Sequence, residues 1–254
     1  MRLTVLGCYG GIGGARRTTA LLLDEDILID AGSGVGELDL EQMARIDHVF
    51  LTHAHLDHSG FVPLLADAVA FMRQKPLLVY ALPETIAALK KYMLNGELWP
   101  DYTIQPSVER PYIRFVPVAP GTPVLLGNRR ITPLPVRHSV PGVGYCLDSG
   151  AGSFVYSGDT TDCDEFWAAL NYIGNLRYLM IETTLLNVAS HAAAASGHLC
   201  AELLARGLAR LQRPVRLLIT HLEPGKEERI MAEVMAACGT FQPERLQQGQ
   251  QFVF

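Results

Sequence analysis

The fold is decided by one stretch of the chain, Leu51-Thr52-His53-Ala54-His55-Leu56-Asp57-His58-Ser59-Gly60, in which three histidines and a carboxylate fall within six residues. Neutral imidazoles and carboxylate oxygens suit a borderline divalent cation such as zinc. His53 and His55 alternate along the chain, so both can face one side of an extended turn. Asp57 and His58 are adjacent and therefore diverge, which favours two metal ions over one. A polar loop that merely contains histidines is the alternative, but chance rarely places these four residues in so short a window.

The segments on either side of this motif indicate that it joins a strand to a helix. The apolar run at residues 47–51 predicts a buried strand that feeds directly into the motif. Apolar residues then recur at helical spacing over residues 61–72, and Pro63 is tolerable because the helix has only just begun. Asp57 falls near the expected helix start, where the positive end of the helix dipole favours an anion.

Length and composition favour one folded unit, residues 1–254, because no Gly/Ser run, Pro-rich spacer or block of like charge interrupts the chain. An apolar fraction of 49% is ample for a core, and no uninterrupted apolar stretch of about 18 residues predicts a membrane span. The N-terminus lacks the features of a signal peptide. Five scattered cysteines without a CxxC pair fit a reducing cytoplasm, each as a small buried residue.

The charge balance argues against a nucleic-acid partner. Twenty-one basic and 26 acidic residues give a net charge of −5. The only adjacent basic pairs are at residues 16–17, 90–91 and 129–130, so no basic stripe is present. A small-molecule partner is therefore expected.

Further ligand candidates follow four hydrophobic runs, at residues 49–52, 131–137, 153–158 and 215–220. The polar residues that end these runs are His53, His138, Asp159 and His221. Loops at strand ends, held by a rigid sheet, are where an α/β site gathers its ligands. Taken singly, His138 could be a loop histidine, His221 a buried histidine, and Asp159 a helix cap, although Asp162 is the better cap candidate. Because His138, Asp159 and His221 follow the motif in this order, the assignment of all three as ligands is stronger than that of any one alone.

The remaining pattern predicts a layered α/β sandwich, because short strands occur in two sets with helices in both halves. Strands are expected at residues 2–7, 18–23, 27–30, 47–51, 77–80, 114–118, 122–126, 129–136, 143–147, 152–157, 176–182, 215–220 and 251–254, and helices at 37–45, after the motif, 84–93, 162–171, 197–212 and 227–237. An Ala-rich loop is expected at residues 189–195.

Two irregular segments allow alternative interpretations. Residues 7–14 contain five glycines and no phosphate-loop signature, so they form either a plain turn or the wall of a site. Residues 95–115 carry Trp99, Tyr102, Tyr112 and Phe115 among prolines. An ordered surface excursion is favoured for this segment, with a lid or a homodimer contact as the alternative.

The order His-x-His-x-Asp-His, then His, Asp and His, resembles the metallo-β-lactamase superfamily over essentially the whole chain. The resemblance implies an αββα four-layer sandwich with two divalent metal ions at one edge, zinc being expected and manganese or iron acceptable. It also implies the ligands. One ion would be held by His53, His55 and His138 and the other by Asp57, His58 and His221, with Asp159 bridging the two beside a hydroxide.

A narrower similarity is to class II 3′,5′-cyclic-nucleotide phosphodiesterases. It covers residues 47–58, 144–150, 157–161, 181–183, 197–199 and 220–224 in the order of that family. Ser59 departs from the pattern, because the family favours an aliphatic residue there. The similarity implies hydrolysis of cyclic AMP or cyclic GMP to the 5′-nucleotide by the metal-bridging hydroxide.

This chemistry requires an acid for the leaving ribose oxygen, and His198 is the candidate. Glu182 ends a strand and could orient that histidine, as carboxylates near metal sites often do. With Asp57 these two form the expected catalytic set. The alternative is that His198 only caps a helix and that Glu182 is a surface carboxylate. His48 and His191 are interpreted as structural.

Electrostatics favours a phosphodiester substrate. Two divalent cations bring four positive charges, and two aspartates with a hydroxide remove three, which leaves about one positive charge for a singly charged substrate. Metal coordination also lowers the pKa of a bound water toward about 7. The alternatives are a tRNA 3′-processing endonuclease, a lactonase or thioester hydrolase, and a metal-dependent interaction module without catalysis.

Overall fold

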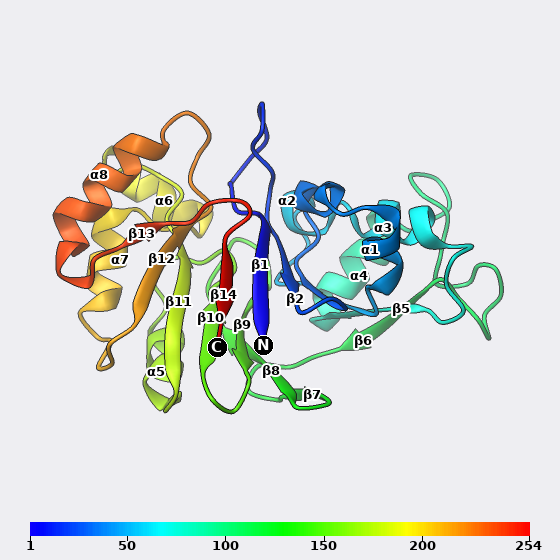
Figure 1. The fold of residues 1–254 in the computed structure, drawn as a ribbon. Helices are drawn as coiled ribbons and strands as arrows, with labels where there is room; N and C mark the ends of the chain where they lie inside the picture. The colour runs from blue at the N-terminus through cyan, green and yellow to red at the C-terminus, as the bar shows by residue number, and fades with distance from the viewer.

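Two seven-stranded sheets with helices on their outer sides make up this computed structural model, which describes residues 1–254 (Figure 1). The first sheet has the order β14-β1-β2-β3-β4-β5-β6. Its strands are β1 Arg2–Gly7, β2 Ala20–Leu23, β3 Ile27–Ile29, β4 His48–Phe50, β5 Leu77–Ala81, β6 Ile113–Pro117 and β14 Gln251–Val253. The helices of this half are η1 Ser33–Glu37, α1 Leu40–Arg45, α2 Leu56–Ser59, α3 Val62–Val69 and α4 Pro83–Tyr92.

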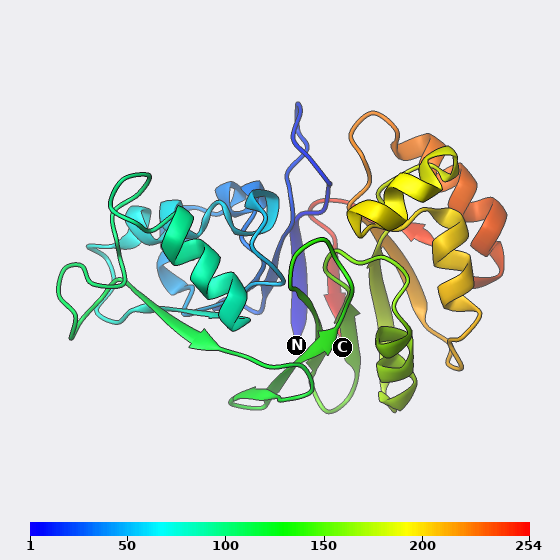
Figure 2. The same ribbon diagram turned by 180° about the vertical axis from the view of Figure 1, so that it is seen from behind.

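The second sheet has the order β13-β12-β11-β10-β9-β8-β7. Its strands are β7 Val124–Leu126, β8 Arg129–Pro135, β9 Val143–Asp148, β10 Ser153–Tyr156, β11 Leu176–Glu182, β12 Arg216–Thr220 and β13 Glu244–Arg245. The helices of this half are α5 Asp164–Tyr172, η2 Asn187–Ala189, α6 Ser190–Ser196, α7 Ala201–Leu208, α8 Glu227–Cys238 and η3 Gly239–Phe241. The reverse view shows α4 and the α5–α8 group on opposite sides of the two sheets (Figure 2).

The two sheets share one pattern of pairing. From β14 to β3 the first sheet is antiparallel, and from β3 to β6 it is parallel. From β7 to β10 the second sheet is antiparallel, and from β10 to β13 it is parallel. The loops that follow the parallel strands of the two sheets therefore lie on the same edge of the molecule. The candidate site described below lies on this edge.

Three apolar layers show that the sheets are stacked between the helices. Along β11, Leu179 and Ile181 pack with the core under α5, α7 and α8, whereas Met180 between them packs with the core between the sheets. Along β4, Val49 packs with the core under α3 and Phe50 with the core between the sheets. Alternate residues of a strand point to opposite faces, so each sheet is covered on both faces. The predicted αββα four-layer sandwich is confirmed.

Most predicted elements occur with shifted ends, but the segment around residue 197 differs in kind. The expected loop at 189–195 is helix α6, and the expected helix at 197–212 begins only with α7. Gly197 separates them because it adopts a left-handed conformation with φ +79°. His198 therefore lies in the link between two helices and not at the start of one.

Two other predictions about helix starts are wrong. The helix expected at 37–45 begins only at Leu40, because Asp39 caps α1 in a reciprocal capping box with Gln42. Helix α5 begins at Asp164, and Asp162 does not cap it. The carboxylate of Asp162 instead accepts a hydrogen bond from the Trp167 indole N–H at 3.1 Å.

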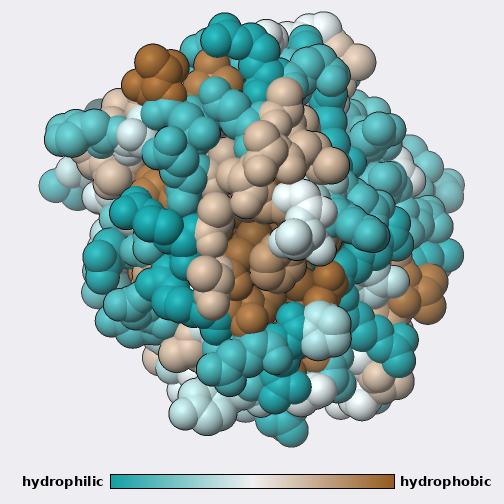
Figure 3. Space-filling view, turned by 90° about the vertical axis from the view of Figure 1, so that its left-hand side faces the viewer, coloured by the Kyte–Doolittle hydropathy of each residue, from teal (hydrophilic) through white to brown (hydrophobic).

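The aromatic segment agrees with an ordered surface excursion. Trp99, Tyr112 and Phe115 pack against the apolar core of the first half, and the Tyr102 hydroxyl donates a hydrogen bond to Asp67. The segment lies beside α4 and β6 at the outer end of this half (Figure 1). At the other end, over α5, α7 and α8, the surface is mostly hydrophilic around a central apolar area (Figure 3). None of the helices combines the length and apolar character needed to cross a bilayer.

Candidate metal centre

Seven side chains predicted as ligands meet at the ends of the strands. They form two groups, and within each group the ligand atoms lie within 4.8 Å of one another. The first group is His53, His55, His138 and Asp159, and the second is Asp57, His58, His221 and Asp159. The division into two groups with one shared aspartate is the one that the superfamily resemblance implied.

Asp159 stands between the two groups and offers one oxygen to each. Its Oδ2 lies 3.7 Å from His53 Nε2 and 3.9 Å from His138 Nε2. Its Oδ1 lies 3.3 Å from His58 Nε2 and 3.5 Å from His221 Nε2. This arrangement is that of a carboxylate able to bridge two cations.

The hydrogen bonds behind the histidines determine which nitrogen faces the centre. His58 Nδ1 donates to Asp30 Oδ2 at 2.7 Å, because a carboxylate can only accept. His138 Nδ1 donates to the Gly197 carbonyl at 2.9 Å for the same reason. The Nε2 atom of each ring is then directed inward, and that of His58 lies 3.2 Å from His221 Nε2.

A group of inward-facing acceptors at these distances fits bound cations. His53 Nε2 and Asp159 Oδ1 are buried without any hydrogen-bond partner, which is costly for polar atoms. A divalent cation in each group would give both atoms a partner. A mixture of imidazole and carboxylate ligands is suited to zinc, manganese or iron. The residues present therefore fit two divalent metal ions.

The pKa shifts describe the same centre in terms of charge. Burial raises the pKa of Asp159, but the charges of His221 and His58 outweigh it and hold the pKa well below its ordinary value. Burial lowers the pKa of His58, but the carboxylates of Asp159 and Asp30 outweigh it and hold that pKa well above the ordinary value. The centre thus stabilises positive charge next to its carboxylates.

His198 and Glu182 lie beside this centre as a pair. His198 Nδ1 donates to Glu182 Oε1 at 2.8 Å, and the His198 ring centroid lies 4.9 Å from that of His138. Burial lowers the pKa of His198, but the charge and hydrogen bond of Glu182 raise it to about 9. Glu182 is fully buried and the residue preceding α7 is Cys200, so neither of the structural alternatives for this pair agrees with the geometry.

The other two histidines lie outside the centre. His48 Nδ1 is 3.1 Å from the Tyr80 hydroxyl on the neighbouring strand. His191 is exposed on α6. Both positions agree with the structural interpretation.

The loop at residues 7–14 forms a wall of the site. The Cys8 carbonyl accepts a hydrogen bond from the backbone N–H of His221 at 2.8 Å, and His221 has a left-handed backbone with φ 59°. A Cβ atom on Gly10 would lie 2.9 Å from His221 Nδ1, so only glycine fits there. Of the two interpretations of this loop, the structure favours the site wall.

Three polar residues that support the ligands were missed in the sequence. Asp30 accepts from His58, Thr52 contacts His53 Nδ1 at 3.0 Å, and Thr184 contacts His221 Nδ1 at 2.9 Å. Asp30 ends the apolar run of β3, so the rule that identified the strand-end ligands could have found it. Thr52 and Thr184 carry no comparable signal.

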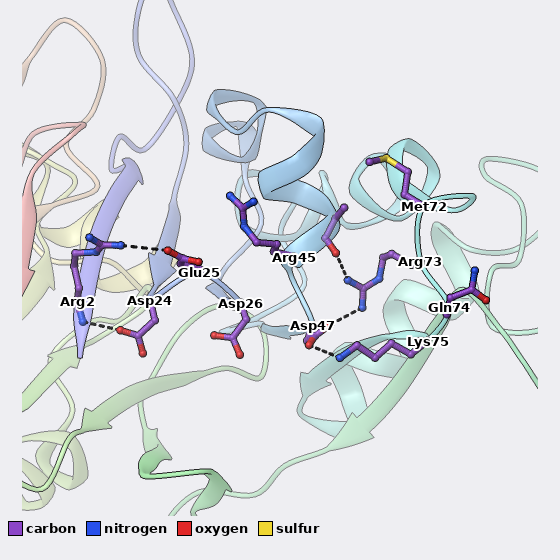
Figure 4. Close-up of a pocket in the computed structure, with 11 residues that line it drawn as sticks. Arg2, Asp24, Glu25, Asp26, Arg45, Asp47, Met72, Arg73, Gln74 and Lys75 are labelled. Atoms are coloured by element: carbon purple, nitrogen blue, oxygen red, sulfur yellow. Dashed lines mark hydrogen bonds and ion pairs between the residues drawn. The ribbon is translucent and has the colours of Figure 1, made fainter.

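A cavity of 970 Å³ lies at the opposite ends of the same parallel strands (Figure 4). Its lining includes the residues that precede β3, β4 and β5. Asp47 is paired there with Arg73 at 2.9 Å and with Lys75 at 2.6 Å. Asp26, which with Asp47 and His48 forms a third possible cation group, is paired with Arg129 at 2.8 Å. Because these carboxylates are already neutralised, this cavity is not a second metal centre.

The fold and the two ligand groups are those of a candidate two-metal protein, and the sequence comparison gives its family. The model of the beta-lactamase superfamily domain matches residues 25–222, which include every residue of both ligand groups. The chain belongs to the metallo-β-lactamase superfamily.

Individual relatives have different activities. A ribonuclease Z of Methanococcus maripaludis is 29% identical over 57% of this chain and 48% of its own length. A probable 3′,5′-cyclic-nucleotide phosphodiesterase of Yersinia pestis is 32% identical over 45% of this chain and 33% of its own. The chain thus spans about half the length of the ribonuclease Z and about a third of the length of the phosphodiesterase.

Two solved structures share the fold over nearly the whole chain. The metallo-β-lactamase fold protein YhfI of Bacillus subtilis superposes with a TM-score of 0.77 at 22% identity, covering 99% of this chain and 98% of its own. Unliganded yeast PDE1 superposes with a TM-score of 0.82 at 16% identity, covering 98% of each chain. At these identities the likeness concerns the fold alone.

Proposed function

We propose that this protein is a two-metal phosphodiesterase that hydrolyses 3′,5′-cyclic nucleotides, cyclic AMP being the first candidate, to 5′-nucleotides. The observation that carries the proposal is the pair of ligand groups that share Asp159, with His198 and Glu182 beside them. The Yersinia relative, named for this activity, supports the choice of substrate. Five free, buried cysteines support a reducing compartment such as the cytoplasm.

Two divalent ions, zinc in our proposal, would be held by the two ligand groups defined above. When bound, such ions neutralise phosphate charge and lower the pKa of a coordinated water. The protein's own contribution is to hold the ligand atoms in place. Asp159 offers one oxygen to each group. Asp57 lies 3.2 Å from His221 and is partly exposed, so it would border the side from which substrate approaches the centre.

In this proposal His198 donates a proton to the leaving oxygen. Because its Nδ1 is bound to Glu182, its Nε2 is the nitrogen able to hold the transferable proton. In opening a 3′,5′-cyclic phosphate to the 5′-nucleotide, the bond from phosphorus to the 3′-oxygen breaks, and that oxygen needs a proton. Glu182 would orient the ring and stabilise its protonated form.

A small substrate agrees with the surface charge and with the aromatic segment. The net charge is −5, and binding of nucleic acid depends mainly on lysine and arginine at phosphates. The longest excursion, residues 95–112, packs on its own half of the molecule and carries few basic residues. The second candidate is RNA 3′ processing, which the Methanococcus ribonuclease Z favours because it matches a larger share of this chain.

The test combines metal analysis with a substrate panel. Purified protein is analysed for bound metal and assayed on cyclic AMP, cyclic GMP, a tRNA precursor, a lactone and a thioester, before and after chelation. We expect two ions per chain and turnover of a cyclic nucleotide that chelation abolishes and Zn²⁺ or Mn²⁺ restores. Cleavage of the tRNA precursor alone would establish the second candidate. Full activity in excess chelator, or activity only on the acyl substrates, would contradict both.

A further inference from the structure

We propose that Thr184 and Thr52 are positioning residues that connect two buried carboxylates to the metal centre through their hydroxyl groups. Neither residue is a metal ligand, and each lies between a buried carboxylate and a histidine that faces the centre. The inference rests on the metal centre proposed above and does not depend on the identity of the substrate.

The connection through Thr184 follows from what each atom can donate. Glu182 is fully buried, and its Oε2 accepts from the Thr184 hydroxyl at 2.8 Å and from the backbone N–H of Thr184 at 3.1 Å. Because a carboxylate only accepts, the hydroxyl proton of Thr184 is used on this bond. Its oxygen can then only accept from His221 Nδ1, which lies 2.9 Å away.

These hydrogen bonds determine the tautomer of His221. With its proton on Nδ1, the ring turns the lone pair of Nε2 toward Asp57 at 3.2 Å and Asp159 at 3.5 Å. A proton on Nε2 would point at the same place and prevent coordination there. The Thr184 hydroxyl thus donates to Glu182 and accepts from His221, so the Glu182 carboxylate determines which nitrogen of His221 carries the proton. The same carboxylate holds His198 directly.

Thr52 repeats the arrangement in the first half of the molecule. Asp30 is fully buried and accepts from the Thr52 hydroxyl at 2.9 Å and from His58 Nδ1 at 2.7 Å. The Thr52 oxygen is then left to accept from His53 Nδ1 at 3.0 Å. Each buried carboxylate therefore controls one imidazole directly and a second one through a threonine hydroxyl. His138, which is held by a neutral carbonyl, lacks such a connection.

The two threonines serve different ligand groups, which makes the proposal specific. His221 belongs to the group with Asp57, and His53 belongs to the group with His55. Partners behind metal-bound histidines commonly change metal affinity by about 10–100-fold when they are removed. Loss of the Thr184 hydroxyl should weaken one ion by about that factor, and loss of the Thr52 hydroxyl should weaken the other.

The experiment titrates metal-free protein with Zn²⁺ against a chromophoric chelator. Thr184→Val keeps the side-chain shape and removes the hydroxyl, and Thr184→Ser restores it. The matched control is Thr183→Val, because the buried Thr183 hydroxyl donates only to the Glu182 carbonyl. We expect Thr184→Val to bind one ion about 10–100-fold more weakly, while Thr184→Ser and Thr183→Val bind both ions like the wild type. Thr52→Val should weaken one ion as well, and combining it with Thr184→Val should weaken both.

Different failures have different meanings. Wild-type protein that binds no zinc would overturn the metal centre and this inference with it. Wild-type affinity for both ions in Thr184→Val would overturn this inference alone. Should Thr184→Val not fold, ¹⁵N NMR of the neutral histidine rings in metal-free wild-type protein decides, because no zinc then determines the tautomer. A proton on Nδ1 of His221 and His53 supports the proposal, and a proton on Nε2 of either contradicts it.

Discussion

Substitution of His198 should reduce turnover without weakening metal binding. His198 contacts Glu182 and lies against His138, but it belongs to neither ligand group. We expect His198→Ala to keep both ions and to lose about 10²–10⁴-fold in kcat, the usual contribution of a positioned acid. Metal analysis and steady-state kinetics on the best substrate check this.

The matched control for that variant is His191→Ala, which changes an exposed histidine on the neighbouring helix α6. It should leave kcat and metal content unchanged. If His198→Ala turned over substrate as fast as His191→Ala, His198 would not be the proton donor.

At the residue scale, local spacing predicted the ligands but not their supports. His53, His55 and His58 lie in one short window, and His138 and His221 follow apolar runs. The supporting bonds join residues far apart in the chain, such as Asp30 with His58, 28 positions away, and Thr184 with His221, 37 positions away. A threonine at such a position looks like any other strand-end threonine until the fold brings its partner to it.

At the scale of an element, the link between α6 and α7 depends on Gly197. A Cβ atom there would lie 2.6 Å from the backbone nitrogen of Ser139 and 2.8 Å from the Cα of His138. Gly197→Ala should therefore cost about 1–2 kcal/mol for the left-handed backbone and about 1–3 kcal/mol more for the clash. Because His138 would be displaced, zinc affinity should fall as well. Urea unfolding and zinc titration measure the two effects.

Gly150→Ala provides the comparison. Gly150 has φ +83° and open space where a Cβ would be, so this variant should show only the backbone cost and normal zinc affinity. Equal losses of stability in the two variants, with zinc binding intact in both, would show that the close approach at Gly197 does not matter.

Helix α6 shows why one element was predicted as a loop. Its sequence, SHAAAAS, contains no large apolar residue, so it has no hydrophobic periodicity to detect. Alanine has the highest intrinsic helix propensity, however, and that signal favoured a helix. Strand β13, with two residues, was too short to predict at all and exists through its pairing with β12.

At the scale of the whole molecule, the metal ions would join the two sheets. His53 follows β4 of the first sheet, while His138, Asp159 and His221 follow strands of the second. A ligand at about 100 times its Kd stabilises the native state by about 2.7 kcal/mol. In a chain of this size about 1 kcal/mol shifts Tm by about 2–4 °C. Chelation should therefore lower Tm by about 5–10 °C for each ion removed.

Differential scanning calorimetry with and without chelator measures that shift. Asp159→Ala, which lacks the carboxylate shared by both ligand groups, should show a much smaller shift on chelation. An unchanged Tm of the wild-type protein in excess chelator would mean that the ions do not stabilise the fold.

The five cysteines offer a separate test of the core. All are buried and unpaired, and burial raises the pKa of Cys8 and Cys146 to about 12 and that of Cys238 to about 11. Because the thiolate is the reactive form, native protein at pH 8 should react very slowly with a thiol reagent such as DTNB. Unfolding in guanidinium should release five reactive thiols. Rapid reaction of the native protein would contradict the burial of these residues.

The sequence predicted most of the strands and the layers of the molecule, but it did not predict the order of the strands within each sheet. Alternating apolar residues indicated strands, but the pairing of β14 with β1 joins Arg2 to Val253 across almost the entire chain. The common pairing pattern of the two sheets could likewise be recognised only in three dimensions.

The large charged cavity at the far ends of the strands has a practical consequence for inhibitor discovery. Fragment screening or docking guided by cavity volume would be drawn to Asp47 and Lys75, which lie at the opposite ends of the strands from the two ligand groups. Compounds that compete with substrate should instead carry a metal-chelating head group, such as a hydroxamate or phosphonate, because the attraction at the histidine cluster comes from charge and coordination more than from enclosed volume.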